Sequence, residues 1–127
     1  MSLTFDPKEG LIVVPTRLWG PSGGTLVRLA LDTGTTGSVV NWDIIMLLGY
    51  DPAIVAERVQ MTTGSGVEFV PRIRVKKIEA SRRERRNFPN LCHTIPPSTT
   101  VDGVLGLDFF RGKRLVLDFR KGLLIID

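Results

Sequence analysis

The sequence predicts an all-β domain, a small closed, barrel-like sheet with one or two short helices. Three observations carry this prediction. Short apolar runs recur along the chain, and turn-forming residues separate them. Only one longer segment has the start, the apolar stretch and the glycine stop of a helix. The length of 127 residues fits a single domain, 1–127, which buries roughly two-thirds of the surface that its unfolded chain exposes.

The first predicted hairpin lies between residues 11 and 31. Its outgoing strand begins with the apolar run Leu11–Val14 and continues towards Trp19. The segment Gly20–Gly24 is a turn by composition, because proline fixes φ and glycine admits positive φ. The chain returns as Thr25–Leu31, where apolar residues alternate and so share one face. This strand ends directly at Asp32-Thr33-Gly34, the tripeptide on which the functional interpretation depends.

Helical signals are confined to two places. Asn41 is the predicted N-cap of a helix over Trp42–Leu48, because its side chain can accept a hydrogen bond from the first turn. Gly49 is the predicted stop, since glycine readily adopts the left-handed conformation that commonly ends helices. A second helical turn is predicted near Asp108–Arg111. No other segment of the sequence looks helical.

A second hairpin is predicted around residues 57–80. Arg58–Thr63 goes out, Gly64-Ser65-Gly66 forms the turn, and Val67–Ala80 returns. The apolar residues of the returning strand change parity at Lys76-Lys77. We therefore expect a bulge or a bend at these two lysines.

The final third of the chain completes the sheet. A strand is predicted near Asn90–Ile95, followed by a proline-rich turn at Pro96-Pro97 and by the segment Val101–Phe110. Arg114–Phe119 and Leu123–Ile126 form a last hairpin, because a glycine-containing turn separates them. The chain contains no internal repeat, low-complexity stretch or linker.

The composition indicates a soluble globular protein. Hydrophobic residues make up 43% and charged residues 24% of the chain, and no apolar run approaches the roughly 20 residues that span a bilayer. Cys92 is the only cysteine, so no disulfide forms within the chain and no multi-cysteine metal site exists. This favours a reducing compartment, and we expect a cytoplasmic protein. Residues 1–3 are compatible with a cloning remnant, so a missing leader, anchor or neighbouring domain stays open.

The net charge of +4 is modest, and much of it lies in Lys76-Lys77 and in the run Arg82–Arg86, which Glu84 interrupts. Such a run is usually a solvated loop or strand end. No nucleic-acid-binding module and no interleaved aromatic residues accompany it, so nucleic acid is not an expected partner. A basic all-β nucleic-acid binder stays a third interpretation, which salt-dependent oligonucleotide binding would support.

Other chemistry-bearing residues favour structural roles. Cys92 and His93 are neighbours in a strand and point to opposite faces, so they cannot form a nucleophile–base pair directly. His93 is the only histidine, which removes a multi-histidine metal site, and we expect no metal and no cofactor. Gly64-Ser65-Gly66 lacks the lysine and the following helix of a phosphate loop. The large aromatic residues lie in apolar patterns and are expected in the core: Trp42, Phe69, Phe88, Phe109 and Phe119.

A carboxylate at the end of an apolar strand is the unusual feature of this sequence. Burying a charge costs several kcal/mol unless it is paired, yet Asp32 directly follows Leu29-Ala30-Leu31. Gly34 lacks a Cβ, so the loop can turn sharply and a substrate backbone can approach closely. Thr33 offers a donor and an acceptor that can lock the loop. Because the tripeptide alone is also a common turn, its catalytic interpretation needs the rest of the chain.

The order of elements around this tripeptide resembles the retropepsin-like aspartic peptidases, which include the retroviral proteases and their single-domain bacterial relatives. Three matches carry the resemblance, which spans about residues 11–126: Leu31-Asp32-Thr33-Gly34 as the catalytic loop, Thr62–Val70 as the flap, and Val101–Phe110 as the closing segment. In the family, two apolar residues and a glycine of the closing segment, here Val104-Leu105-Gly106, pack beside the catalytic loop. The resemblance implies a retropepsin fold that pairs as a two-fold homodimer.

The resemblance also implies an aspartic endopeptidase that needs no metal and no covalent intermediate. Asp32 of two chains would meet across a two-fold axis and share one proton, so that one carboxyl activates water and the other donates to the oxyanion. Thr33 would hydrogen-bond across to the partner's loop. Asp32, Thr33 and Gly34 are thus the implied catalytic residues, and the partners are a peptide or protein substrate and a second copy of the chain. The implied substrate-binding residues of the flap are Thr62, Thr63, Gly64, Ser65 and Gly66.

Two departures from the retroviral pattern concern substrate binding. Retroviral enzymes usually carry an acidic residue and an arginine where this chain has Thr36 and Leu107, so this acid–arginine pair is absent. The Gly-Leu-Asp-Phe form of the closing segment looks closer to the bacterial branch, and Asp108 is expected to cap the final helix. The alternative function is a catalytically weak or inactive dimerisation or peptide-binding module. Asp32 argues against it, because a pure scaffold has no reason to bury two facing carboxylates.

Overall fold

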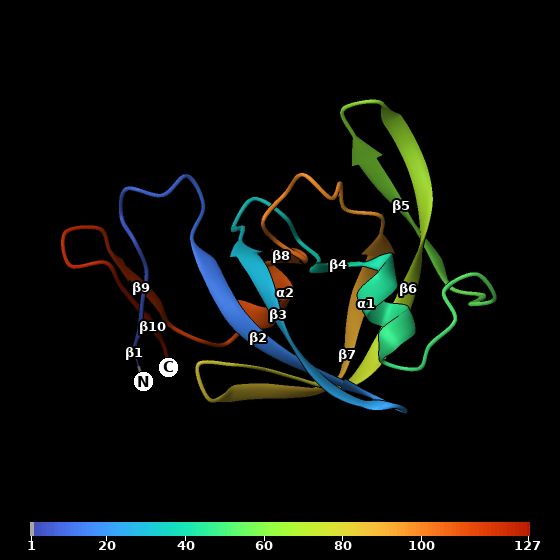
Figure 1. Cartoon of the computed structure of the whole chain (residues 1–127), viewed down its shortest axis with the longest axis horizontal. Coiled ribbons are helices and arrows are strands. Elements are labelled where there is room, and N and C mark those ends of the chain that lie inside the picture. Colours follow the sequence, from blue (N-terminus) through green and yellow to red (C-terminus); the bar gives the residue numbers. More distant parts are fainter. Residues whose placement is uncertain (1) are drawn as a thin grey trace.

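Strands close into a six-stranded barrel in the computed structural model, which describes residues 2–127 (Figure 1). The barrel order is β2-β3-β8-β4-β7-β6, and a pairing of β6 with β2 closes it. The fold is therefore all-β and barrel-like, as predicted. The strands are β2 (Val13–Gly20), β3 (Gly23–Leu31), β4 (Val39–Asn41), β6 (Gly66–Ala80), β7 (Arg83–His93) and β8 (Gly103–Leu105).

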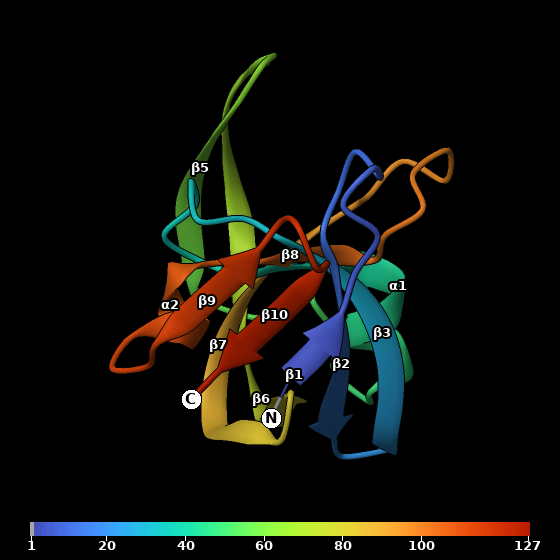
Figure 2. The ribbon, with the colours of Figure 1, turned by 90° about the vertical axis from the view of Figure 1, so that its left-hand side faces the viewer.

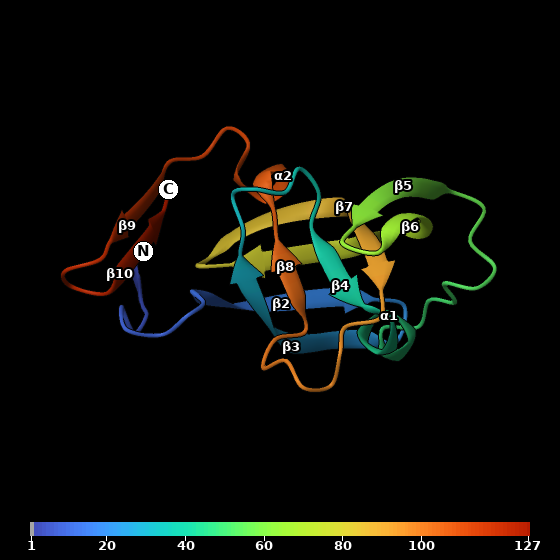
Figure 3. The same ribbon diagram turned by 90° about the horizontal axis from the view of Figure 1, so that it is seen from above.

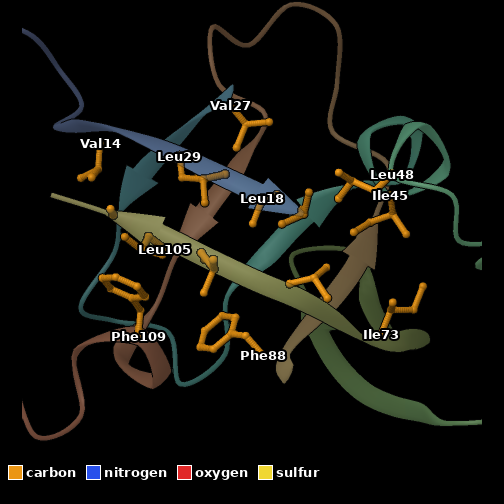
Figure 4. Close-up of a cluster of buried hydrophobic side chains, with 14 of the residues drawn as sticks. Val14, Leu18, Val27, Leu29, Ile45, Leu48, Ile73, Phe88, Leu105 and Phe109 are labelled. Atoms are coloured by element: carbon orange, nitrogen blue, oxygen red, sulfur yellow. The ribbon is translucent and has the colours of Figure 1, made fainter. Parts of the chain in front are cut away.

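The barrel interior is filled mainly by aliphatic side chains and by phenylalanines, among them Phe88 and Phe109 (Figure 4). Leu18 and Leu29 come from the first hairpin, whereas Leu105 and Phe109 come from the closing segment. All four side chains are fully buried. Burial of a leucine or phenylalanine side chain stabilises a fold by roughly 1.5–3 kcal/mol. The two segments that flank the predicted catalytic loop are thus anchored in one core.

The short strand β8 is inserted between β3 and β4, parallel to β3 and antiparallel to β4. Glycine is required where it begins, because a Cβ added to Gly103 would lie 2.0 Å from the carbonyl oxygen of Val39. Backbone atoms of a central strand cannot move aside without breaking the ladder. The closing segment therefore contributes a strand to the barrel wall, next to the end of β3.

The predicted helix and hairpins are largely confirmed. α1 spans Trp42–Leu47, and Gly49 follows it with a φ of 99°. Asn41 occupies the N-cap position, but its side chain makes no capping hydrogen bond, so that detail of the prediction is wrong. The hairpins close at the predicted turns because each turn contains glycine or proline. No helix in residues 2–127 is long and apolar enough to cross a membrane.

The predicted irregularity at Lys76-Lys77 is a bend without an inserted residue. Val75 and Ile78 are both buried although they differ in parity. The register between β6 and β7 is nevertheless the same on both sides, since Val75 pairs with Phe88 and Lys77 pairs with Arg86. Asn87 on β7 has a φ of 51°, in the left-handed region. Both strands therefore turn together, which lets the outer half of β6 reach β2 and close the barrel.

The strand predicted near Asn90 begins earlier, at Arg83, so the predicted start is wrong. Its first half carries the arginine run and pairs with Lys77–Ala80 of β6. Arg83 donates from Nε to the Ile126 carbonyl, and Arg85 donates to the carbonyls of Phe109 and Arg111. This half was not predicted because its charged side chains leave no apolar alternation in the sequence. In the structure its guanidinium groups bind backbone carbonyls of neighbouring segments.

The chain ends form a separate three-stranded sheet beside the barrel (Figure 2). β10 (Leu123–Ile126) lies between β1 (Ser2–Thr4) and β9 (Leu115–Asp118). The predicted hairpin of Arg114–Phe119 and Leu123–Ile126 is therefore confirmed, and β1 adds an unpredicted third strand that makes β10 the central one. Leu124 and Ile126 are buried against the core.

Two of the aromatic residues expected in the core are exposed. Phe69 is 67% exposed on β6, and Phe119 is 60% exposed in the turn between β9 and β10. Phe119 packs edge-to-face on Phe5 with ring centroids 5.6 Å apart. Phe88 and Phe109 are buried, as predicted.

Candidate active site

The predicted catalytic tripeptide follows β3 and starts the loop that leads to β4 (Figure 3). The backbone N–H of Asp32 donates to the carbonyl of Leu105 at 3.0 Å. One residue earlier, the N–H of Leu31 donates to the carbonyl of Ile12 at 2.8 Å. The chain is therefore held from both sides up to Asp32, whose side chain is partly exposed. This places a single carboxylate at a fixed position on the surface.

Gly34 holds the Asp32 carboxylate through its backbone. Its N–H donates to Oδ1 of Asp32 at 2.8 Å. A Cβ added to Gly34 would lie 3.1 Å from the same oxygen, a distance at which one of the two groups would have to move. Glycine at this position thus leaves the carboxylate in place, whereas a larger residue would push it by a few tenths of an ångström.

Thr33 lies between these two residues and is exposed. Within residues 2–127 its hydroxyl takes part in no hydrogen bond. Its partner must therefore come from outside the chain if the hydroxyl has a structural role. The Asp-Thr-Gly tripeptide occurs once, so a single chain supplies one such aspartate.

The loop after the tripeptide rests on the start of α2 (Leu107–Phe110). The N–H of Leu107 donates to the Thr35 carbonyl at 2.9 Å, and the N–H of Asp108 donates to the Thr36 carbonyl at 3.2 Å. A Cβ on Gly106 would lie 3.0 Å from backbone atoms of Gly37. The closing segment therefore packs beside the catalytic loop, as the family resemblance implied.

Asp108 binds the far end of the catalytic loop and does not act as the predicted helix cap. Gly106 occupies the N-cap position of α2 and makes no side-chain capping bond. The Asp108 carboxylate accepts from the backbone N–H of Ser38 at 3.0 Å and from its hydroxyl at 2.7 Å. It also accepts from the N–H of Phe109 at 2.9 Å. The carboxylate therefore joins α2 to the loop.

Ser38 is the residue at this site that sequence reasoning missed. It is fully buried, and its Oγ accepts from the N–H of Gly106 at 2.9 Å while donating to Asp108. The two segments lie 70 residues apart in the chain. No local pattern marks such a pair, although a serine inside an apolar run, before Val39-Val40, was a signal that it has a buried partner.

We expect Ser38→Ala to lower the free energy of unfolding by about 1–3 kcal/mol, because Gly106 and Asp108 each lose a buried partner. Thr36→Ala is the matched control, since Thr36 lies on the same loop, is exposed, and makes no side-chain hydrogen bond within residues 2–127. It should change stability by less than about 0.5 kcal/mol. Urea denaturation of both variants measures the difference. Equal midpoints for the two variants would show that the Ser38 bonds contribute nothing.

The predicted flap residues form the tip of the hairpin of β5 (Arg58–Thr63) and β6. Thr63 pairs with Gly66, and the Thr63 hydroxyl binds the hydroxyl of Ser65 at 3.1 Å and the Gly66 carbonyl at 3.2 Å. Gly66 has a φ of 130°, which favours glycine. The tip is thus ordered by its own contacts and projects from the barrel on the right in Figure 1.

A cavity of about 420 Å³ separates the catalytic loop from the flap hairpin. Thr35–Ser38 form one wall, and Val59–Thr62 of β5 form the opposite wall. Leu91 and Arg72 add one apolar and one cationic side chain. Of the predicted substrate-binding residues Thr62–Gly66, only Thr62 lines this cavity, and Asp32 is not among its lining residues. The structure therefore brings the loop and the root of the flap together around a space large enough for a side chain.

The nearby thiol is inert. Cys92 is 1% exposed, and burial raises its pKa to about 12. The side chain of His93 contacts Glu68 and the Thr94 carbonyl instead. This confirms that the neighbouring cysteine and histidine do not form a thiol-peptidase pair.

Comparisons with known proteins agree with this geometry. A family model described as aspartyl protease matches residues 18–109. The fold is similar to a retropepsin-like aspartic protease from Rickettsia conorii, with a TM-score of 0.74 and 15% identity over 99% of this chain and 88% of that one. It is also similar to the retroviral protease-like domain of Ddi1 from Leishmania major, with a TM-score of 0.62 and 19% identity over 94% of this chain and 90% of that one. No curated protein sequence matches the chain closely.

Proposed function

This chain belongs to the aspartyl protease family, and from that premise we propose that it is an aspartic endopeptidase whose active site forms when two copies pair. The observation that carries the proposal is the position of Asp32. Its backbone is fixed by Leu105, and its carboxylate is held by Gly34, at the end of a core strand. A cavity between the same loop and the flap hairpin supports a peptide substrate.

In the proposed mechanism the two Asp32 carboxyls face each other across a two-fold axis. Two carboxyls in contact cannot both be charged cheaply, so they share one proton. The charged carboxyl takes a proton from a bound water, which attacks the peptide carbonyl. The protonated carboxyl donates to the developing oxyanion. The flap tip, Thr62–Gly66, closes over the substrate and excludes water.

The terminal sheet is the proposed main contact between the copies. Leu123 and Ile125 lie on the face of β10 opposite to the buried Leu124 and Ile126, and both are partly exposed. Val116 pairs with Ile125 and shares this face. Within residues 2–127 the outer edges of β1 and β9 pair with no other strand, and unpaired edges invite association. Sedimentation tests this step, since a strictly monomeric species that cleaves peptides would contradict it.

The alternative is a dimerisation or peptide-binding module of the same fold with little or no turnover. Thr36 and Leu107 stand where the retroviral enzymes usually carry the acid–arginine pair. In either function a peptide would therefore have to be held without that pair. Incubation with a peptide library at acidic and neutral pH, with Asp32→Ala as the comparison, separates them. Peptides bound by both proteins and cut by neither would favour the module. We also propose a reducing, cytoplasmic location, on the ground that Cys92 is the only cysteine.

The pH profile of cleavage should be bell-shaped, because a shared-proton pair works only in its singly protonated form. The optimum should lie at roughly pH 4–6, from the general behaviour of facing carboxyls. Initial rates on one cleaved peptide, measured from pH 3 to pH 9 in buffers of roughly constant ionic strength, test this. A rate that rises steadily to the alkaline end would indicate a different base.

A further inference from the structure

A single histidine joins the flap hairpin to the barrel. Nε2 of His93, near the end of β7, lies 2.8 Å from Oε2 of Glu68 on the flap strand β6. The other side-chain hydrogen bonds of residues 59–70 that the described chain contains stay within the tip, between Thr63, Ser65 and Gly66. The contact of Glu68 with His93 is therefore the outermost polar link between flap and barrel in residues 2–127.

The link spans the point where the two strands separate. The ladder between β6 and β7 starts at the pair Arg72–Leu91 and runs away from the flap. Pro71 precedes Arg72 and has no N–H to donate, so the ladder cannot continue across it. Beyond this proline β6 diverges from β7, and a cavity of about 290 Å³ lies between them, lined in part by Trp42 and Phe69. Glu68 and His93 both line this cavity, and their side chains meet across it.

Both ring nitrogens of His93 face hydrogen-bond acceptors. Nδ1 of His93 lies 2.9 Å from the Thr94 carbonyl, which can only accept a hydrogen bond. Nε2 faces the Glu68 carboxylate, which when ionised also only accepts. A neutral imidazole carries one N–H, so it can satisfy one of these acceptors and turns a lone pair towards the other. With Glu68 ionised, both contacts are hydrogen bonds only when both ring nitrogens carry protons.

The remaining groups around His93 do not replace Glu68. The same cavity contains two other ionisable side chains, Arg58 of β5 and Cys92 of β7. The thiol stays neutral because burial raises its pKa to about 12. The arginine hydrogen-bonds to the carbonyls of Pro52 and Ala53 in the preceding loop. β4 and α1 contribute Asn41, the register partner of His93, and Trp42, neither of which titrates.

We propose that the pair of His93 and Glu68 is a pH-dependent tether of the flap, formed under acidic conditions and released as the imidazole loses its proton. Imidazoles change charge between about pH 5 and 8, and carboxylates are ionised above about pH 4–5. The tether is therefore complete in mildly acidic solution and weakens towards alkaline pH. The role of the flap in substrate binding rests on the proposed function, whereas the tether itself depends only on the fold.

Hydrogen exchange of backbone amides tests the tether without any cleavage assay. Protection factors of flap amides, divided by those of the β2–β3 hairpin as an internal reference, are measured at pH 5.5 and pH 8. The pair is partly exposed, with 29% of the His93 and 51% of the Glu68 side chain accessible. We therefore expect a modest fall in relative flap protection, about three- to tenfold, between the two pH values.

Three variants complete the experiment. His93→Gln and Glu68→Gln each remove one titrating partner, and both should abolish the pH dependence of flap protection. Glu57→Gln is the matched control, because Glu57 forms an ion pair with Arg72 at the root of the flap, at 3.3 Å. Arginine and glutamate keep their charges over this range, so this variant should retain the wild-type pH dependence. The proposal is overturned if relative flap protection in the wild type does not change between pH 5.5 and pH 8. It is also overturned if His93→Gln and Glu68→Gln both show the wild-type fall in protection. Neither result bears on whether Asp32 cleaves peptides.

Discussion

Asp32→Asn should abolish peptide cleavage, with a loss of at least about 1,000-fold, while the protein stays folded and paired. An amide has the shape of the carboxyl but cannot take a proton from water, so the reaction loses its base. Its Oδ1 can still accept the N–H of Gly34, which now lies 2.8 Å away. Initial rates on a peptide that the wild type cuts measure the loss, and sedimentation measures pairing.

Asp32→Asn should abolish turnover without weakening the dimer. Two facing amides carry no mutual repulsion and need no shared proton, so the dimer should be as stable as the wild type or more stable. Asp43→Asn is the matched control, because Asp43 is an exposed carboxylate in the first turn of α1. It should keep wild-type turnover. If Asp32→Asn also keeps it, the catalytic assignment is wrong and the peptide-binding module takes its place.

The hairpins could be predicted from the sequence because their signals are local. Gly64-Ser65-Gly66 and Gly20–Gly24 supply turn residues between apolar runs, so each pair of strands was found with nearly correct bounds. β1 was missed because Ser2–Thr4 has no pattern of its own and is a strand only through pairing with β10. The first half of β7 was missed for a similar reason, since Arg83–Arg86 are ordered by carbonyls of distant segments.

The position of the Asp-Thr-Gly loop at the end of a core strand was predicted, but the contacts that hold it were not. Asp32 and Gly34 lie two residues apart, and their hydrogen bond follows from the tripeptide itself. The contact between Ser38 and Asp108 joins segments 70 residues apart that only the barrel brings together, so Asp108 was mistaken for a local cap. Phe69 was expected in the core because apolar alternation cannot distinguish a barrel strand from a hairpin that projects beyond it.

Thr33→Ala should weaken pairing, with a dissociation constant at least about 30-fold higher than that of the wild type. The Thr33 hydroxyl is exposed and takes part in no hydrogen bond within residues 2–127, which leaves it free to bond across the proposed two-fold axis. Each dimer would lose two such bonds, and a buried group left without a partner costs about 1–3 kcal/mol. A total of about 2 kcal/mol or more corresponds to this change in affinity.

The activity of Thr33→Ala should fall chiefly through dissociation and should recover in part at high protein concentration, since Asp32 and Gly34 are unchanged. Thr33→Ser is the matched control, because it keeps the hydroxyl and removes only a methyl group. Its dissociation constant should stay within about threefold of the wild-type value, because the hydrogen bond depends on the hydroxyl alone. Sedimentation and rate measurements over the same concentration series test both expectations.

A Thr33→Ala protein that is fully dimeric yet inactive would contradict an assembly role and would place the hydroxyl in the chemistry. The two substitutions in the tripeptide thus separate the reaction from the pairing: Asp32→Asn should remove turnover at every concentration, whereas Thr33→Ala should remove it only where the chains have come apart.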